Sequence, residues 1–553
     1  MVFTADFETT TNPADCRVWA YGLCEIDNPA NFLYGNSIDD LMQFCKNDEH
    51  TLYFHNLKFD GEFILVWLFE NNYRFEPDRK KLVKNTFTTL ISDKGQFYSM
   101  EIVHEGHKTK IFDSLKILPF SVAEVAEGFN LPISKLEIDY HEDREIGHIL
   151  TIEEINYLKN DVLIMAMALN ILFKQGLNKI TQGSNALHNY KQTVTTKKFN
   201  KWFPVPDYDA DIRQSYKGGF TYLSPRFKNL DISNGIVLDV NSLYPSVMYY
   251  SKLPYGEGIF FKGEYQTDKV YSLYIQMFTC NFELKKNYIP TIQLKNNLSF
   301  IPNEYVTSSN GEDVTLCLTS VDMALFKEHY NIYNIEYHSG WKFKGTTGLF
   351  KEYIDYWNGV KVQATIDGNK AMRTLAKLML NALYGKFGLN PMVRSKYPFY
   401  ENGRIKYTLG PQEFRKPIYI PMASFITAWA RYKTITSAQS VYERFIYADT
   451  DSLHLVGTDL PENLEIDPTK LGAWKHESTF TRARFIRQKT YMEEIDGKIN
   501  ITCAGMPKQC YSHVTWENFR EGNSFEGKLM PKHVVGGIVL TETDFTIKTS
   551  KRS

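Results

Sequence analysis

The sequence predicts an α/β (α+β) fold divided into two or more domains, and three observations support this expectation. The chain has 553 residues, more than one hydrophobic core accommodates. Short apolar runs typical of strands alternate with stretches of helical periodicity up to about residue 182. Residues 1–190 carry 28 Asp and Glu against 17 Lys and Arg, whereas basic residues outnumber acidic ones in 191–553. We therefore expect the two parts to perform different chemistry.

The N-terminal part contains four carboxylates in three short motifs. They are Asp6 and Glu8 in DFET, Asp60 in FHNLKFDG, and Asp161 in YLKND. Alternation along a strand that begins at Val2 puts Asp6 and Glu8 on one face. Tyr157 lies one helical turn before Asp161. Four carboxylates are the ligand set that a two-metal phosphodiesterase needs, and a tyrosine hydroxyl can orient the attacking water. Each motif taken alone is more often structural.

Residues 183–211 are expected to form a connector, because Thr-Lys and Pro-rich runs replace the periodic pattern there. The sequence Tyr216-Lys217-Gly218-Gly219 follows. Two adjacent glycines allow a backbone to approach a partner closely, and template phosphates are one candidate partner. A plain turn is the alternative.

Two acidic elements follow in the second part of the chain. Asp239 ends an apolar strand that begins at Gly235. The run YADTDS at 447–452 predicts a β-hairpin with an acidic tip, and alternation predicts that Asp449 and Asp451 share a face. Two carboxylates on a buried face repel unless a cation lies between them, and Mg²⁺ suits such oxygen ligands. The ordinary alternatives are a helix N-cap for Asp239 and a solvated turn for the D-x-D run.

Between these acidic elements lies the run KAMRTLAKLMLNALYGKFG at 370–388, whose apolar residues recur at helical spacing. A polar stripe follows another side of this helix and contains Lys370, Arg373, Lys377, Asn381 and Tyr384. Such a stripe can hold a triphosphate and stack on a base. A solvated amphipathic helix is the alternative.

Taken in order, D-x-x-S-L-Y-P, K-x-x-x-N-x-x-Y-G and Y-x-D-T-D-S resemble motifs A, B and C of family B DNA polymerases. The N-terminal motifs resemble those of the DnaQ-like (RNase H-like) 3′–5′ exonuclease domain that precedes such polymerases. The resemblance implies a right-hand polymerase domain with palm, fingers and thumb. It also implies a DNA-directed DNA polymerase with proofreading, and two Mg²⁺ ions in each active site, for which Mn²⁺ can substitute.

Two inserted segments indicate the subgroup. Residues 251–348 are β-rich and lack a catalytic signal, whereas 391–416 place Asn-Gly between two aromatic-rich runs, a strong hairpin signal. They resemble the TPR1 and TPR2 regions of protein-primed polymerases from small Bacillus-type phages with linear genomes. The implied division is an exonuclease domain at 1–182 and a polymerase domain at 183–553, with a fingers helix region at 349–390 and a thumb at about 507–553.

The second insert carries six Lys and Arg against two Glu, so we expect its strands to be too basic to be buried. A projecting basic hairpin could close a ring over DNA and separate the downstream strands, which would give processive strand displacement. A surface loop without such a role is the alternative.

The resemblance also implies roles for single residues. The polymerase catalytic and metal-binding set is Asp239, Val240 through its carbonyl, Asp449 and Asp451. Tyr244 is implied as a steric gate against ribonucleotides, and the other nucleotide contacts are Lys361, Arg373, Lys377, Asn381 and Tyr384. The exonuclease set is Asp6, Glu8, Asp60 and Asp161 as metal ligands, with Tyr157 and Lys135 assisting.

The remaining implied roles are contacts with DNA. The single-strand contacts are Thr9, His55, Asn56, Phe59, Ser114, Leu115 and Tyr140. The contacts with template and primer are Tyr216, Lys217, Gly218, Gly219, Thr427, Arg431, Lys489 and Tyr491. In the family the Y-x-G-G motif helps to shift the primer strand between synthesis and editing.

Seven scattered cysteines without a C-x-x-C pair argue against a zinc ribbon or a disulfide framework and indicate a reducing compartment. No apolar run approaches the roughly 18 residues that span a bilayer, and we expect no signal peptide. The expected setting is a monomer in the cytoplasm of a bacterial host, with template and primer DNA, dNTPs and a terminal protein as partners.

The sequence leaves three alternatives to a protein-primed polymerase. A family B polymerase that extends RNA or DNA primers would not need a terminal protein. A catalytically inactive binding protein is disfavoured because all six key carboxylates are present, and a dedicated exonuclease would not need the helix at 370–388.

Overall fold

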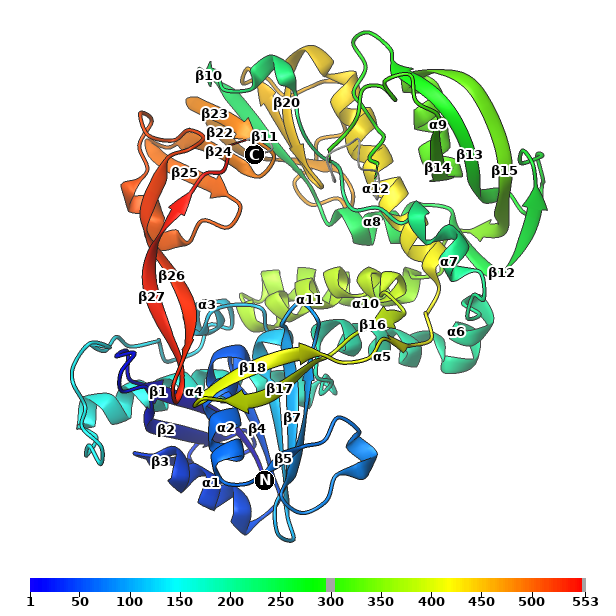
Figure 1. Cartoon of the computed structure of the whole chain (residues 1–553). Helices are drawn as coiled ribbons and strands as arrows, with labels where there is room; N and C mark the ends of the chain where they lie inside the picture. Colours follow the sequence, from blue (N-terminus) through cyan, green and yellow to red (C-terminus); the bar gives the residue numbers. More distant parts are fainter. Residues whose placement is uncertain (295–303, 550–553) are drawn as a thin grey trace.

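The computed structural model of the protein describes residues 1–294 and 304–549. Helices and strands are mixed throughout, which confirms the predicted α/β class. Figure 1 shows an N-terminal sheet with its helices below a second group of sheets, and the hairpin β26–β27 runs from one group to the other. No helix among the described residues is long and apolar enough to cross a membrane.

The N-terminal region is an eight-stranded sheet in the order β3-β2-β1-β4-β8-β7-β6-β5. Its strands are β1 (Val2–Thr9), β2 (Val18–Glu25), β3 (Phe32–Gly35), β4 (His50–Phe54), β5 (Arg74–Phe75), β6 (Thr86–Ile91), β7 (Phe97–Val103) and β8 (Lys108–Asp113). Its helices are α1 (Ile38–Asn47), α2 (Leu57–Glu70), α3 (Val122–Gly128) and α4 (Ile152–Lys174). A capping box formed by Thr151 and Glu154 starts α4, which packs against β1 and β2. This packing brings the first and last carboxylate motifs together.

The predicted connector at 183–211 is wrong, because this segment is helical and belongs to the core. It contains α5 (Gln182–Val194), α6 (Thr196–Trp202) and α7 (Asp209–Ile212). Ala186, Tyr190 and Val194 recur every four residues along α5 and are buried. The ring of Tyr190 lies 4.9 Å from that of Phe350, centroid to centroid. The sequence did not predict these helices because their apolar stripe is short and lies between Thr and Lys residues. Those residues lie on the opposite side of the helices or cap them.

The central sheet of the second region has the order β22-β11-β21-β20-β9. Its strands are β9 (Thr221–Leu223), β11 (Gly235–Val240), β20 (Phe445–Asp449), β21 (Ser452–Val456) and β22 (Trp474–Phe480). Helices α8 (Leu243–Tyr250) and α12 (Ile420–Ser440) pack with this sheet through one large hydrophobic core. A smaller sheet beside it contains β10 (Asp231–Ile232), β23 (Arg482–Arg487), β24 (Thr490–Ile495) and β25 (Lys498–Cys503).

The first inserted segment folds as a sheet in the order β12-β15-β13-β14 with one helix. These elements are β12 (Leu253–Lys262), β13 (Leu273–Leu284), β14 (Val314–Thr319), α9 (Ser320–His329) and β15 (Tyr330–Thr346). Residues 295–303 of this segment lie outside the described residues. It is followed by the antiparallel helices α10 (Lys351–Ile366) and α11 (Lys370–Ala382). Asn369 caps α11 by accepting a hydrogen bond from the Met372 amide.

The hairpin predicted in the second insert is confirmed. Strands β17 (Lys396–Glu401) and β18 (Arg404–Leu409) pair around Asn402 and Gly403, whose φ angles of 53° and 76° suit a tight two-residue turn. The short strands β16 (Met392–Val393) and β19 (Glu413–Phe414) close its base. The expectation that it is too basic to be buried is wrong for one face, because Pro398 and Ile405 are buried. The basic side chains lie on the other face or at the ends.

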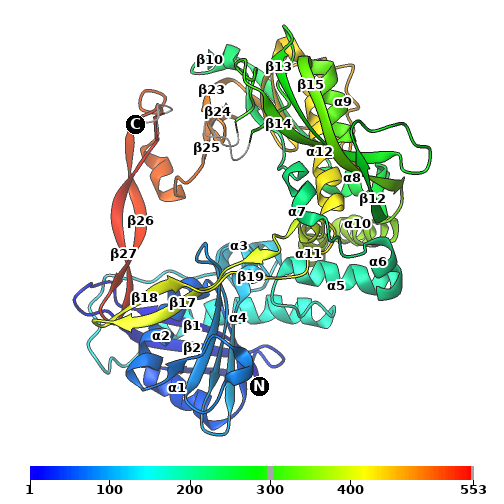
Figure 2. The same ribbon diagram turned by 45° about the vertical axis from the view of Figure 1, so that its right-hand side comes forward.

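The C-terminal part ends in a long hairpin formed by β26 (Ser524–Val534) and β27 (Gly537–Thr546). Its base packs on a small core that includes Phe519 and Ile547, while its tip reaches the N-terminal sheet region (Figure 2). Residues 550–553 lie outside the described residues.

Candidate active sites

The N-terminal carboxylates line one cavity of about 530 Å³ between the end of β1, helix α2 and helix α4. The predicted residues in its wall are Asp6, Glu8, Thr9, His55, Asn56, Phe59, Asp60, Lys135, Tyr140, Tyr157 and Asp161. Leu529, Val539 and Leu540 of the C-terminal hairpin complete the wall. Three sequence motifs and the distant hairpin therefore meet at one place.

Lys135 compensates the charge of the carboxylates in this cavity only in part. Burial, and then repulsion by Asp161, raises the pKa of Asp6 to about 7. Burial, and then Asp6, raises the pKa values of both Glu8 and Asp60 well above their usual range. The Oδ1 atom of Asp161 is buried without a hydrogen-bond partner. This donor set suits a divalent cation, which would remove the repulsion and supply the missing partner.

Lys135 and two tyrosines form the polar edge of the cavity. Lys135 Nζ donates a hydrogen bond to the Tyr157 hydroxyl at 3.1 Å and pairs with Asp161 Oδ2. Burial opposes its charge, but Asp161 outweighs this effect and raises the pKa of Lys135. Burial, and then Glu8, raises the pKa of Tyr157, so its hydroxyl keeps its proton. Tyr140 shares a hydrogen bond with that hydroxyl.

Two of the predicted single-strand contacts, Ser114 and Leu115, are not part of the cavity wall. Ser114 is fully buried, and its Oγ lies 2.9 Å from His55 Nδ1. The sequence did not indicate a role for Asp113. In the structure its Oδ1 accepts hydrogen bonds of 3.0 Å from the backbone amides of Asn56 and Leu115. The pair Asp113-Ser114 therefore fixes the segment that carries the cavity residues.

The second acidic site lies where β11 meets the turn between β20 and β21. The Val240 amide donates a hydrogen bond to the Asp451 carbonyl at 2.8 Å. The N-cap alternative for Asp239 is excluded, because Asp239 lies within β11 and Ser242 occupies the N-cap position of α8. The predicted hairpin is confirmed, but the alternation argument is wrong: β20 ends at Asp449, and Asp451 belongs to the turn. Thr450, with a φ of 60°, reverses the chain there.

Asp239 and Asp451 repel each other. Burial, and then Asp451, raises the pKa of Asp239 to about 7. Burial also raises the pKa of Asp451. Lys475 and Glu477 of β22 were missed by the sequence analysis. Lys475 pairs in register with Asp239, and its Nζ lies 2.9 Å from Glu477 Oε2. Only strand pairing reveals this contact, since Lys475 is 236 residues away in the sequence.

Asp449 differs from its neighbours because it has its own cation. Lys489 Nζ lies 3.0 and 2.9 Å from its two carboxylate oxygens, and Thr221 Oγ1 donates to Oδ1 at 3.1 Å. The Lys489 backbone amide also donates to the Tyr447 hydroxyl at 3.0 Å. Tyr491 packs nearby, with its ring 5.2 Å from that of Tyr447.

The helix pair α10–α11 brings cations toward the same site. Lys361 Nζ donates a hydrogen bond of 3.4 Å to Ser242 Oγ, and Ser242 lies three residues after Asp239 in the sequence. Burial, and then Lys377 and Arg373, lowers the pKa of Lys361. A triphosphate would relieve this repulsion among the cations. Asn381, on the same helix face, is exposed.

Tyr244 and Tyr384 form a stacked pair above this site. Their ring centroids are 4.1 Å apart with an interplanar angle of 17°. Tyr244 lies in the first turn of α8, the helix after β11, and Tyr384 follows α11, so the stack joins α8 to the end of the cationic helix.

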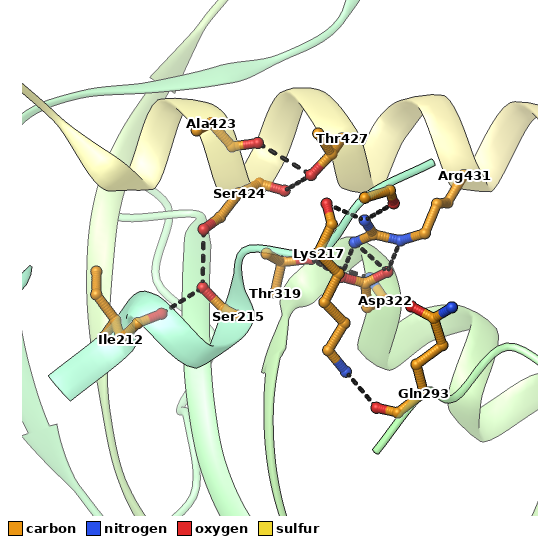
Figure 3. Close-up of polar contacts among 11 residues, drawn as sticks. Ile212, Ser215, Lys217, Gln293, Thr319, Asp322, Ala423, Ser424, Thr427 and Arg431 are labelled. Carbon is orange, nitrogen blue, oxygen red and sulfur yellow. Dashed lines mark hydrogen bonds and ion pairs between the residues drawn. The ribbon is translucent and has the colours of Figure 1, made fainter. Parts of the chain in front are cut away.

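The backbone of the Y-x-G-G segment is hydrogen-bonded to Arg431, which forms a buried ion pair with Asp322 (Figure 3). Arg431 is 2% exposed and donates to the carbonyls of Lys217 and Gly218 at 3.0 and 2.9 Å. Its other nitrogens bond both carboxylate oxygens of Asp322 on α9, the shortest at 2.8 Å. Thr427 is also buried and donates to the Ala423 carbonyl. These contacts give Arg431 a positioning role toward the Y-x-G-G segment. The direct DNA contacts of Thr427 and Arg431 stay a prediction.

The remaining residues of this segment differ in how much space surrounds them. Lys217 is buried and its Nζ donates to the Gln293 carbonyl at 3.3 Å. A Cβ on Gly219 would lie 2.5 Å from Thr450 Oγ1, whereas one on Gly218 would meet nothing within 4 Å. Gly219 is therefore required by the acidic turn, and only Gly218 leaves room for a ligand.

Within residues 1–294 and 304–549, no three His, Cys, Asp or Glu side chains form a ready-made metal site. The oxygen donors of the two acidic sites nevertheless fit a divalent cation in kind and charge.

Comparisons with known proteins agree with this geometry. Residues 41–151 and 137–468 match the family model for DNA polymerase type B, organellar and viral. The chain is 49% identical to the DNA polymerase of Bacillus phage phi29 and 32% identical to that of Streptococcus phage Cp-1, each comparison covering 99% of this chain and 98% or more of the relative. A structure of the phi29 polymerase complexed with primer-template DNA and incoming nucleotides matches with a TM-score of 0.94 at 48% identity, covering 99% of this chain and 100% of that one.

Proposed function

The chain belongs to the type B DNA polymerases of organelles and viruses and is a DNA-directed DNA polymerase. We propose that it replicates a linear phage genome from a protein primer and that it proofreads its product. The observation that carries the proposal is the presence of two separate sites of mutually repelling carboxylates, one in each half of the chain. The proposed substrates are primer-template DNA and dNTPs, the molecules bound in the matching phi29 structure.

In the polymerase site, Asp239, Asp451 and the Val240 carbonyl would hold two Mg²⁺ ions. Bound Mg²⁺ supplies the charge that lowers the pKa of the attacking hydroxyl and stabilises the leaving pyrophosphate. The triphosphate would be oriented by Lys361, Arg373 and Lys377. Without it, the positive charges of these side chains repel one another. The stacked Tyr244–Tyr384 pair would support the incoming base and sugar.

In the N-terminal cavity, Asp6, Glu8, Asp60 and Asp161 would hold the metal ions of a 3′–5′ exonuclease. The protonated Tyr157 hydroxyl, held by Lys135, would orient the attacking water. Thr9, Phe59 and Tyr140 in the wall would hold the last nucleotides of a single strand. Proofreading is supported by the meeting of all these groups in one cavity.

Protein priming and strand displacement are supported by the two inserted segments and by the identity to phage polymerases. A terminal protein would supply the first hydroxyl. The basic hairpin β17–β18 and the C-terminal hairpin β26–β27 would enclose DNA between them. We place the enzyme, as a monomer, in the cytoplasm of the bacterial host.

The test is incubation with labelled dATP, Mg²⁺ and a candidate terminal protein in the absence of any nucleic acid primer. Formation of a labelled protein adduct is expected. Extension of oligonucleotide primers without any adduct would instead support the alternative of a polymerase that uses nucleic acid primers.

A further inference from the structure

The tips of two hairpins that are distant in sequence meet on helix α2 of the N-terminal region (Figure 2). The Gly536 amide at the tip of β26–β27 donates a hydrogen bond to the Gly403 carbonyl at the tip of β17–β18, at 3.1 Å. Ile405 of one hairpin and Ile538 of the other share a hydrophobic core with Phe63 of α2. The junction therefore has three sides, and each side contacts the other two.

The C-terminal hairpin approaches the N-terminal region too closely for a side chain at Gly536 or Gly537. A Cβ on Gly537 would lie 2.5 Å from the Phe63 ring, and one on Gly536 would lie 2.3 Å from the Cys16 carbonyl oxygen. Approaches this close indicate that the hairpin tip packs tightly and specifically against the N-terminal region.

A carboxylate lies in the middle of the junction. Glu62 of α2 is only 4% exposed, and burial raises its pKa to about 7 although the hydrogen bond from Tyr407 opposes this shift. Its Oε1 accepts a hydrogen bond of 2.6 Å from the Tyr407 hydroxyl on β18, and its Oε2 lies 3.5 Å from His533 Nδ1 on β26. Burial, and then Lys58, lowers the pKa of His533, so this second contact is not an ion pair near neutral pH. Among the described residues, Glu62 Oε2 has no hydrogen-bond partner, so the contact with β26 is one of proximity. Glu62 is thus the polar group that both hairpins contact.

We propose that Glu62 is a positioning residue that fastens the two hairpins to the exonuclease domain and so holds a ring closed around bound DNA. The inference rests on the proposed function, in which the two hairpins enclose DNA. Glu62 lies two residues after Asp60 on α2, but its described side-chain contacts are with Tyr407 and His533 of the two hairpins. The role inferred for it is therefore to retain DNA.

The physical chemistry of the junction suits a fastening that can open. A hydrogen bond from a hydroxyl to a carboxylate is strong and directional in a site shielded from water. When the junction opens, water reaches Glu62 and its hydration offsets the lost hydrogen bond. The ring is therefore stable when closed and still able to open when DNA enters.

The chain provides a matched control on the same hairpin and the same helix. The Tyr400 hydroxyl donates to Glu70 Oε1 at 2.7 Å, but this contact is exposed to solvent. Tyr407→Phe removes one buried hydroxyl and keeps the ring, whereas Tyr400→Phe removes one exposed hydroxyl in the same way. Solvent-exposed contacts to charged groups contribute little, so the two substitutions separate the fastening from general loss of a tyrosine hydroxyl.

The experiment measures dissociation of the full-length enzyme from primed circular DNA in the presence of a heparin trap. Tyr407→Phe is expected to dissociate about 10-fold faster than the unmodified protein, because the hydrogen bond to the buried Glu62 carboxyl group is lost. Glu62→Gln, which keeps an oxygen acceptor for Tyr407, is expected to have a smaller effect. Tyr400→Phe is expected to match the unmodified protein, and single-nucleotide insertion on a short primer is expected to be equal in all four proteins.

Hydrogen–deuterium exchange of residues 396–409 and 534–539 reports the junction without depending on activity. Faster exchange of both segments in Tyr407→Phe, but not in Tyr400→Phe, is expected. Unchanged exchange and unchanged dissociation in Tyr407→Phe would overturn the inference. If the unmodified protein itself left circular DNA after a few nucleotides, the enclosing ring of the proposed function would be wrong, and exchange alone would decide whether Glu62 fastens the hairpins.

Discussion

The ammonium group of Lys489 lies 3.0 and 2.9 Å from the two carboxylate oxygens of Asp449, so this aspartate is the only member of its acidic triplet that forms an ion pair among the described residues. Asp239 and Asp451 lack a comparable partner, and burial raises the pKa of each. The three aspartates of the proposed polymerase site are therefore not equivalent. Two are suited to hold cations, and the third orients the lysine that follows β23.

The first prediction concerns this pair. Lys489→Ala leaves Asp449 without its cation and should reduce primer extension roughly 10-fold to 100-fold, since hydrogen bonds to charged groups contribute about 1.5–3 kcal/mol. Degradation of single-stranded DNA should stay unchanged, because the carboxylates of the proposed nuclease site lie in the N-terminal part of the chain. Steady-state kcat and KM for a primed template check this result, with Lys489→Arg as the charge-preserving control. Equal extension by all three proteins would refute it.

The second prediction is a separation of the two activities. Asp451→Ala should abolish primer extension and spare degradation of single strands, whereas Asp6→Ala combined with Glu8→Ala should do the reverse. Each site needs its own carboxylates to hold its cations. Both activities should stop when Mg²⁺ is removed with a chelator and return when Mg²⁺ or Mn²⁺ is added. Loss of both activities in one folded variant would show that the chain has a single shared site.

The third prediction concerns sugar selection. Tyr244→Val removes the ring that stacks 4.1 Å from Tyr384 and should open space beside the sugar of the incoming nucleotide. The ratio of ribonucleotide to deoxyribonucleotide insertion should rise roughly 10-fold to 100-fold, the range for a change in pocket packing. Competition assays check it, and Tyr244→Phe, which keeps the ring, should retain the original preference. An unchanged ratio in the valine variant would mean that another residue selects the sugar.

The fourth prediction concerns the hairpin β17–β18. Deletion of residues 392–414 should be tolerated by the backbone, because the Arg415 amide already bonds the Pro391 carbonyl at 2.7 Å. Short gap filling should remain nearly intact, while products on long templates with a competitor trap should become shorter and synthesis should stall at duplex DNA. Because the deletion uncovers the site of Ile405, thermal unfolding should be measured as well. Continued long-range displacement by the folded deletion variant would contradict the prediction.

The fifth prediction concerns the buried pair behind the Y-x-G-G segment. Asp322→Ala leaves the guanidinium of Arg431 buried without its carboxylate, a change that typically costs about 3–5 kcal/mol of stability. The carbonyls of Lys217 and Gly218 should then be held less firmly, which should alter the balance between synthesis and degradation on a primed template. Urea unfolding and the ratio of the two activities at limiting dNTP check this. A variant with unchanged stability would show that the pair is not the anchor.

Local spacing predicted the parts of the sites that lie close together in the chain. The Asn402-Gly403 turn was predicted correctly, because left-handed φ angles at two successive positions favour these residues. The placement of Asp6 and Glu8 at one cavity also followed from strand alternation. The same rule failed for Asp449 and Asp451, because the strand ends at Asp449, two residues before Asp451.

The sequence by itself determined the fold class, the acidic hairpin and the carboxylates of both sites, because these depend on residue type and short-range periodicity. Only the tertiary structure decided that Lys489 pairs with Asp449, that Arg431 is an interior anchor, and that Glu62 lies between two hairpins. The helical nature of 182–202 also depended on packing against Phe350 and its neighbours. These features arise from contacts between residues that are tens to hundreds of positions apart, and no local pattern of charge or hydrophobicity encodes which distant groups will meet.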